Sequence, residues 1–410
     1  IAPTTGRSSR MLELAAWLLL PLAAHIGFSS FGFNPTDDGF IMAMSRRLLD
    51  GQIPHRDFIS IRPVGSALLH MPEVWLGGPI TLWLGRLVAW CEFAVIAFCW
   101  VDLAAVLTRE PLARVDRFLR GVVAFVLSSH VFPPMPWHTL DALALVSLGS
   151  WLAARPGRRG STLGFCLIGS SALCRQNFIL LPVVAILCLG RVRSWRTWIA
   201  ALAPSLLYIA SLAVLGALPD AGLQLTTRMD LLRWGVLPYL GSLPMWGGFV
   251  AGLVLTVLLE SRSPGPGQER VAGRHVIGLV AMALVFAAVG LTMLPSALVF
   301  IQHSAFLVFG LCVGHLAALL RTGARPAGRQ GLLVLALATA WSASVSIGYC
   351  SPALALAVLF GALYHAANRP FHLAAGLATG LAAGIAAGPG GASRVPRVVS
   401  LLLALVLVAT

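Results

Sequence analysis

Long apolar runs recur along this chain and are separated by short polar connections. The clearest runs cover residues 12–33, 80–107, 197–218, 245–259 and 331–348, and most approach or exceed the roughly 20 residues that a membrane-spanning helix needs. With 58% hydrophobic and only 11% charged residues, the chain cannot cover itself with polar side chains as a water-soluble protein does. A transmembrane β-barrel would require alternating polarity, which these runs lack. The sequence therefore predicts an all-α polytopic integral membrane protein.

Arginine clusters mark every second connection between the apolar runs. They lie at residues 7–10, 109–120, 155–159, 191–196, 262–274 and 321–329. Because basic loops stay on the cytoplasmic side of a membrane, we expect the N-terminus and residues 108–118 and 155–161 to be cytoplasmic. Residues 34–79 then form the first outer loop, and the expected location is an inner (plasma) membrane. This placement accounts for the formal net charge of +14, which therefore does not indicate nucleic acid as a partner.

The basic and thiol side chains limit the chemistry. All 29 basic residues are arginine, which excludes a lysine Schiff base and a phosphate-binding-loop lysine. The seven cysteines lie mostly inside apolar runs without the spacing of a metal site, as is typical of small buried hydrophobic side chains. The sequence indicates no redox centre.

The first outer loop is long enough to contain structure of its own. Residues 39–49 place Phe40, Ile41, Met44 and Leu48 on one helical face, opposite Ser45, Arg46 and Asp50. This pattern predicts a short helix lying in the membrane interface. Residues 64–76 are apolar enough to dip into the membrane.

Short apolar segments follow the second long run, at residues 119–132, 138–153, 162–174 and 178–190. Helices of this length are tilted or sheltered by neighbours, as around a cavity at membrane depth. We expect a bundle of about 11–14 transmembrane helices in total. Residues 1–217 would form a catalytic membrane module and residues 218–410 a more variable set of helices, with no soluble domain.

Ionisable groups gather in the first outer loop, where placing charge near a membrane is costly unless the charge is used or paired. The group comprises Asp37 and Asp38, then His55, Arg56 and Asp57, then Arg62. Capping of the following helix is a structural alternative for the two aspartates, since an aspartate there could accept free helix amides. Two adjacent carboxylates exceed what one cap requires, so we take Asp37 and Asp38 as catalytic candidates.

Further candidates lie at the starts of later helices. His138 and Asp141 are one helical turn apart, a spacing that lets both face one cavity; a structural hydrogen bond between them is the alternative. Arg175 begins the segment Arg-Gln-Asn-Phe. Glu92 lies within the second long run, where a carboxyl group must be protonated or paired.

These motifs together resemble the membrane-embedded GT-C glycosyltransferases, specifically the bacterial branch related to protein O-mannosyltransferases and lipid A aminoarabinose transferases. The resemblance covers roughly residues 12–190. Its motifs are Asp37-Asp38-Gly39-Phe40, the stretch from Arg46 to Phe58, Arg62-Pro63, His138 to Asp141, and Arg175-Gln176. Two departures stand out: Arg62 occupies a position where the family usually has lysine, and the soluble C-terminal domain of many members is not found.

The resemblance implies transfer of a sugar from a polyprenyl-phosphate donor to an acceptor hydroxyl on a glycan, lipid or protein. Asp37 would act as the general base, and a single displacement would invert the anomeric centre. Arg62 would bind the donor phosphate, supported by Arg56 and Arg175, because a guanidinium binds phosphate through two parallel hydrogen bonds.

This chemistry requires no metal or other cofactor, although His55 and the acidic pair leave a divalent ion open. Two other functions also remain open. A transporter or flippase for a lipid-linked or polar substrate would use broken helices and buried charges as well. A non-catalytic subunit of a membrane complex could keep the same fold. The concentration of ionisable groups in the first half favours an enzyme.

Overall fold

The chain folds into a bundle of α-helices. The computed structural model describes residues 7–31, 37–109, 112, 114–129, 134–226, 243–261, 297–321, 327–344 and 358–362. Within these ranges there is no β-strand, and a single isolated bridge pairs Pro54 with Phe58. The expected all-α class is therefore confirmed for the described part of the chain.

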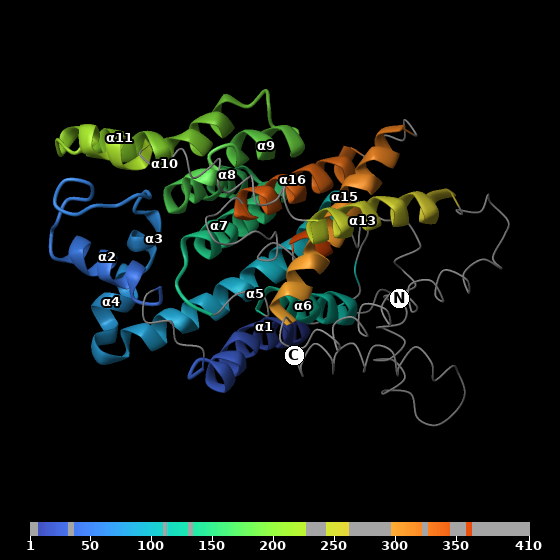
Figure 1. The fold of residues 1–410 in the computed structure, drawn as a ribbon, viewed down its shortest axis with the longest axis horizontal. Helices are drawn as coiled ribbons and strands as arrows, with labels where there is room; N and C mark the ends of the chain where they lie inside the picture. The colour runs from blue at the N-terminus through green and yellow to red at the C-terminus, as the bar shows by residue number, and fades with distance from the viewer. Residues whose placement is uncertain are drawn as a thin grey trace.

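Helices occupy the apolar runs, with short helices in the first loop (Figure 1). They are α1 Arg7–Phe28, α2 Phe40–Leu49, α3 Gly65–Leu69, α4 Met71–Gly77, α5 Thr81–Thr108, α6 Arg114–Ser129, α7 His138–Ala154, α8 Arg158–Cys174, α9 Leu181–Cys188, α10 Trp195–Val214, α11 Leu218–Thr226, α13 Leu243–Ser261, α15 Ala297–Arg321 and α16 Ala327–Ser344, with 3₁₀ turns η1 Gly78–Ile80 and η2 Gln176–Phe178. The ends of α5 and α7 agree with the predicted ends to within one residue. The first helix begins and ends about five residues earlier than predicted.

Helix α5 forms the centre of the bundle because it is apolar on all sides. A helix without a polar face is stable only when neighbours surround it. Phe93, Ile96, Trp100 and Leu103 of α5 are almost fully buried, and α1, α6, α7 and α16 pack around them. The indole nitrogen of Trp100 donates a hydrogen bond to Ser147 Oγ of α7 at 2.9 Å. This contact satisfies the polar atom of the largest core side chain.

One end of the bundle is formed by α2, α3, α4 and α11, and we call it the loop end (Figure 1). Helix α5 starts there at Thr81 and runs to the opposite end, where Asp102 is held by arginines of two other helices. Arg155 Nη2 lies 2.7 Å and Arg117 Nε 3.5 Å from its carboxylate. Trp151 Nε1 also donates to it at 2.6 Å. The two ends of α5 thus meet different sets of polar groups.

Helix α2 forms as the amphipathic pattern predicts, but its buried face differs. Ile41 and Met44 are buried, whereas Phe40 is exposed at the start of the helix. Ser45, expected on the polar side, is fully buried and its hydroxyl donates to the carbonyl oxygen of Ala67 at 2.7 Å. The hydroxyl is satisfied by α3, which sequence periodicity alone does not reveal.

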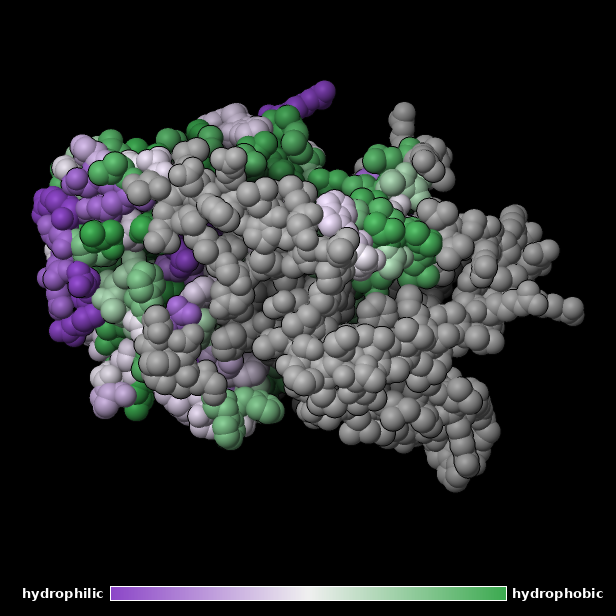
Figure 2. Space-filling model, viewed as in Figure 1, coloured by the Kyte–Doolittle hydropathy of each residue, from purple (hydrophilic) through white to green (hydrophobic). Residues whose placement is uncertain are grey.

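Large apolar side chains cover much of the outer surface of the described residues (Figure 2). Two helical segments, Met71–Thr108 and Trp195–Val214, are long and apolar enough to cross a membrane. On α10 the exposed apolar side chains include Ile199, Leu206, Leu207 and Val214. Hydrophilic residues gather at the loop end, on the left of Figure 2.

Candidate functional site

Asp38 and Arg86 form a buried ion pair at the loop end. Arg86 Nε and Nη2 lie 3.2 and 2.9 Å from the two carboxylate oxygens of Asp38. The remaining guanidinium nitrogen, Nη1, donates to the carbonyl oxygens of Ser29 and Phe31 at 2.6 and 2.7 Å. This bidentate geometry is the strongest form of a charge-assisted hydrogen bond. Asp38 therefore ties the segment before α2 to α5 and to the end of α1.

Asp37 directly precedes this pair but is only half-buried. Its carbonyl oxygen accepts a hydrogen bond from the Phe40 amide at 3.2 Å. The N-cap residue of α2 is Gly39, so neither aspartate occupies the capping position that was the structural alternative. Of the two carboxylates, Asp37 is the more accessible to a substrate.

Four predicted residues gather around the N-terminus of α7. Trp137 is the N-cap, in extended conformation, and His138 and Asp141 are fully buried in the first turn. Arg175 ends α8 and its guanidinium donates to the Thr139 hydroxyl of α7. The guanidinium carbon of Arg62 lies 5.6 Å from the ring centre of Trp137. The structure thus brings Arg62, His138, Asp141 and Arg175 to one helix end.

The start of α2 reaches the same place. The ring of Phe40 lies 6.1 Å from that of His138 in an edge-on arrangement, and Phe40 follows Asp37 by three residues. Both Arg62 and Arg175 act electrostatically on the His138 ring. The start of α2, which follows the acidic pair, therefore lies beside the α7 N-terminus.

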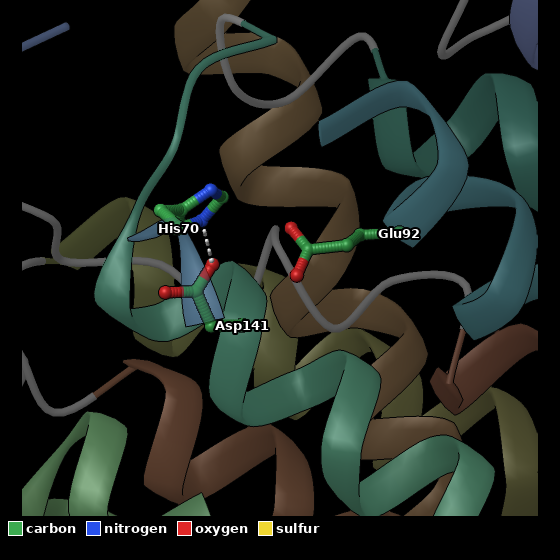
Figure 3. A group of neighbouring side chains, drawn as sticks. All are labelled: His70, Glu92 and Asp141. Atoms are coloured by element: carbon green, nitrogen blue, oxygen red, sulfur yellow. Dashed lines mark hydrogen bonds and ion pairs between the residues drawn. The ribbon is translucent and has the colours of Figure 1, made fainter. Parts of the chain in front are cut away.

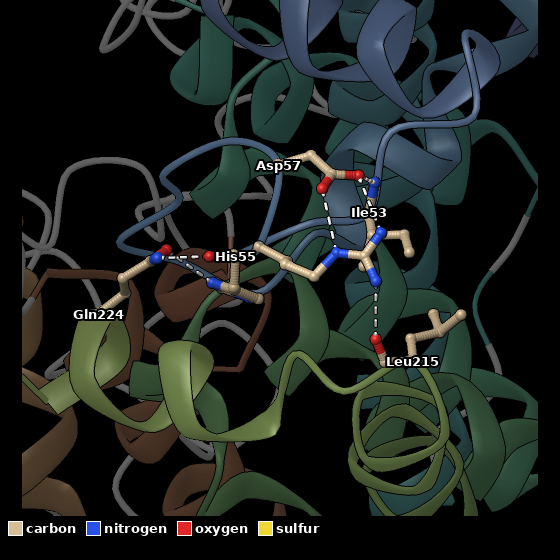
Figure 4. Close-up of polar contacts among 6 residues, drawn as sticks. Ile53, His55, Asp57, Leu215 and Gln224 are labelled. Carbon is tan, nitrogen blue, oxygen red and sulfur yellow. Dashed lines mark hydrogen bonds and ion pairs between the residues drawn. The ribbon is translucent and has the colours of Figure 1, made fainter.

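His55, Arg56 and Asp57 lie elsewhere, against α10 and α11 (Figure 4). The ring of His55 contacts Gln224 Oε1 through Nδ1 at 3.1 Å and the Tyr208 hydroxyl through Nε2 at 2.7 Å. Arg56 donates to the carbonyl oxygen of Leu215 at 3.1 Å. These contacts fasten the first loop to α10 and α11. They give structural roles to His55 and to Arg56, which we expected to support binding of the donor phosphate.

Burial and neighbouring groups shift two pKa values in this loop. Burial lowers the pKa of His55 below its usual value, although the hydrogen bond to Gln224 opposes the shift. Hydrogen bonds from Arg56 and from the Ile53 amide lower the pKa of Asp57. At neutral pH the loop therefore carries a neutral imidazole and an ionised, exposed Asp57.

A second buried cluster contains residues that sequence reasoning did not propose as a site. His70, between α3 and α4, lies 2.8 Å from Glu73 through Nδ1 and 3.2 Å from Asp141 through Nε2. The carboxyl group of Glu92 on α5 points toward the same space (Figure 3). The spacing His70-x-x-Glu73 within an apolar stretch was the one available signal. Its partners Glu92 and Asp141 come 22 and 71 residues after His70 in the chain, so only folding reveals them.

No protein-family model, curated protein sequence or solved structure matches this chain. The proposed function therefore rests on the residues of the site and their chemistry.

Proposed function

We propose that the protein is a polytopic membrane glycosyltransferase of the GT-C type, acting at the outer face of an inner (plasma) membrane. The exposed apolar surfaces of α1 and α10 support the membrane location, because contiguous apolar surface of this extent is unstable in water. The lipid tail of a polyprenyl-phosphate donor would lie along such a surface. Its sugar would enter at the loop end.

The main support for this proposal is the pair of arginines beside the N-terminus of α7. Free amides and the helix dipole make a helix N-terminus attractive to phosphate. Here Arg62 stacks over the N-cap residue Trp137, and Arg175 is bound to Thr139, the second residue of the helix. Two guanidinium groups beside one helix N-terminus suit the phosphate of a lipid-linked sugar.

The chemical step assigns the base to Asp37. The oxygen of an acceptor hydroxyl forms a bond to the anomeric carbon while the bond from that carbon to the phosphate oxygen breaks. Asp37 takes the hydroxyl proton, and polyprenyl phosphate leaves with the bonding electrons. Arg62 and Arg175 balance the charge of the phosphate, so the leaving group needs no proton. His138, in the first turn of α7, would contact the sugar.

Donor binding tests the role of Arg62. Losing a charge-assisted bidentate contact costs about 1.5–3 kcal/mol, or roughly ten- to more than hundredfold in affinity. We expect Arg62→Ala to weaken binding of a polyprenyl-phosphate sugar to the purified protein by this factor. Arg62→Lys should be milder, since the charge remains but the planar fork is lost.

Arg46→Ala is the matched control, because Arg46 is an exposed arginine of the same loop whose side chain pairs with the exposed Asp50. It should leave donor affinity unchanged. Unaltered affinity in Arg62→Ala would contradict the phosphate role. If the reconstituted protein moved a lipid-linked sugar across vesicles without transferring it, the transporter reading would replace the enzyme. If the protein bound no donor, a non-catalytic role in a membrane complex would replace the enzyme interpretation.

A further inference from the structure

The buried cluster beneath α4 combines one imidazole with three carboxyl groups from three parts of the chain. His70 lies at the junction of α3 and α4, Glu73 on α4, Glu92 on α5 and Asp141 on α7. The side chains of His70 and Asp141 are at most 1% exposed. One ligand atom each from His70, Glu92 and Asp141 lies within 4.8 Å of the others.

Three carboxylate oxygens in this cluster have no hydrogen-bond donor among the described residues. They are Oδ2 of Asp141, Oε2 of Glu92 and Oε2 of Glu73, and each is shielded from solvent. The carboxyl groups of Glu92 and Asp141 face each other closely. Adjacent buried carboxylates repel and are poorly solvated, so something positively charged or a proton must lie between them.

We infer that His70, Glu92 and Asp141 form a binding site for a divalent transition-metal ion. One imidazole nitrogen with two carboxylate oxygens suits Zn²⁺ or Mn²⁺, whereas Mg²⁺ and Ca²⁺ favour oxygen ligands alone. Three protein ligands leave a fourth position open to water or another oxygen. Ligands of a tetrahedral zinc are roughly 3.3 Å apart at metal–ligand distances of about 2.0–2.1 Å, so ligand atoms that lie up to 4.8 Å apart would close by up to about 1.5 Å when the ion binds.

Glu73 gives the cluster a further feature of metal sites. A histidine that binds metal through one nitrogen usually donates the other N–H to a carboxylate, which fixes its tautomer and orientation. Here Glu73 Oε1 lies 2.8 Å from His70 Nδ1, which directs Nε2 toward Asp141 and Glu92 (Figure 3). Glu73 is thus the outer carboxylate that positions the histidine ligand.

The competing explanation is a proton in place of the metal. An imidazolium at His70 could donate to both Glu73 and Asp141, with a second proton shared by Asp141 and Glu92. Both arrangements leave Oε2 of Glu73 without a donor among the described residues, so that atom does not distinguish them. The proton explanation predicts no affinity for metal, so the two explanations are separable by direct binding.

The test measures metal content and needs no glycosyl donor, so its outcome is independent of the proposed function. The detergent-purified full chain is stripped with chelator, incubated with ZnCl₂ or MnCl₂, dialysed and analysed by mass spectrometry for bound metal. We expect one tightly held ion per chain. Co²⁺ serves as a spectroscopic probe, and its visible absorption should show nitrogen and oxygen ligation in a site of low symmetry.

Variants then assign the ligands. Asp141→Asn, Glu92→Gln and His70→Ala should each abolish stoichiometric binding and the Co²⁺ spectrum, and Glu73→Gln should weaken affinity by roughly 10–100-fold. Asp102→Asn is the matched control. Asp102 lies on α5, as Glu92 does, but its carboxylate pairs with Arg155 and Arg117 and takes no part in the cluster. This variant should retain one ion even if it unfolds more easily. A wild-type chain that binds no metal, or variants that bind as much as the wild type, would overturn the site in favour of shared protons.

Discussion

The two adjacent aspartates, Asp37 and Asp38, differ in their burial and in the contacts of their carboxylates. Both oxygens of Asp38 are engaged by Arg86 in a pair that is almost fully buried. Because both of its oxygens are engaged in this pair, Asp38 has a structural role. Asp37 is half-buried and lies three residues before Phe40, whose ring lies 6.1 Å from that of His138 at the α7 N-terminus. Asp37 is therefore the carboxylate that we propose as the base.

Asparagine substitutions separate the two roles. Asp38→Asn should lower the free energy of unfolding by about 3–5 kcal/mol, because removing one partner leaves the Arg86 charge buried without compensation. Asp37→Asn should leave unfolding within about 0.5 kcal/mol of wild type, as is usual for substitutions away from the core, but abolish sugar transfer. Unfolding is measured by denaturant titration in detergent, and transfer in purified membranes. Retained transfer in Asp37→Asn would exclude Asp37 as the base.

The His55 network predicts a pH dependence of stability. Burial lowers the pKa of His55 in the folded state, while the nearby Asp220 and the hydrogen bond to Gln224 oppose the shift. The unfolded chain therefore takes up a proton first as pH falls below about 6.5, and the folded state loses stability down to the lower folded pKa. Above about 6.5 this contribution is fully present.

His55→Gln isolates this contribution, because glutamine keeps hydrogen-bonding capacity without titrating. The difference in melting temperature between wild type and His55→Gln should shrink between pH 7.5 and pH 5. A constant difference across that range would show that His55 titrates at the same pH in the folded and unfolded chain.

Glycines set the distance between helices α7 and α8. A Cβ at Gly164 would lie 2.5 Å from the carbonyl oxygen of Gly149 and 2.6 Å from the amide nitrogen of Ala153. These are backbone atoms and cannot rotate away. The close approach of α7 and α8 positions Asp141 and Arg175, which lie on these helices at the same end.

Gly164→Ala should therefore destabilise the fold by about 1–3 kcal/mol, the usual effect of overpacking. Gly160→Ala is a control in the same helix, since its Cβ would meet only the Leu152 carbonyl oxygen at 3.7 Å. It should be neutral or stabilise by up to about 1 kcal/mol through helix propensity. The comparison is made by unfolding in detergent. Equal stability of the two variants would mean that α7 and α8 separate without cost.

At the scale of the whole molecule, the exposed apolar helices and the polar loop end predict one orientation in the membrane. We expect Gln52→Cys, in a chain without other cysteines, to react from outside with an impermeant thiol reagent, because Gln52 is exposed in the first loop. Arg158→Cys should react only after the membrane is opened, since basic segments remain cytoplasmic. Labelling of position 158 from outside would reverse the topology and remove the proposed site from the outer face.

Local sequence patterns determined the helices of this protein. Apolar runs predicted α5, α7, α8 and α10 because length and hydrophobicity are properties of consecutive residues. The same reasoning predicted α2 and its amphipathic character, and it selected Arg62, His138, Asp141 and Arg175 as candidates. In the structure these four lie at one helix end. Their chemistry remains a prediction.

Contacts between distant segments could be decided only by the tertiary structure. The different surroundings of Asp37 and Asp38 depend on Arg86, which pairs with Asp38 and lies 48 residues after it. The cluster of His70, Glu92 and Asp141 likewise joins a helix junction to two helices whose approach depends on packing. A pattern of neighbouring residues specifies a helix and its faces, but which faces meet depends on close packing of the whole bundle, to which every helix contributes.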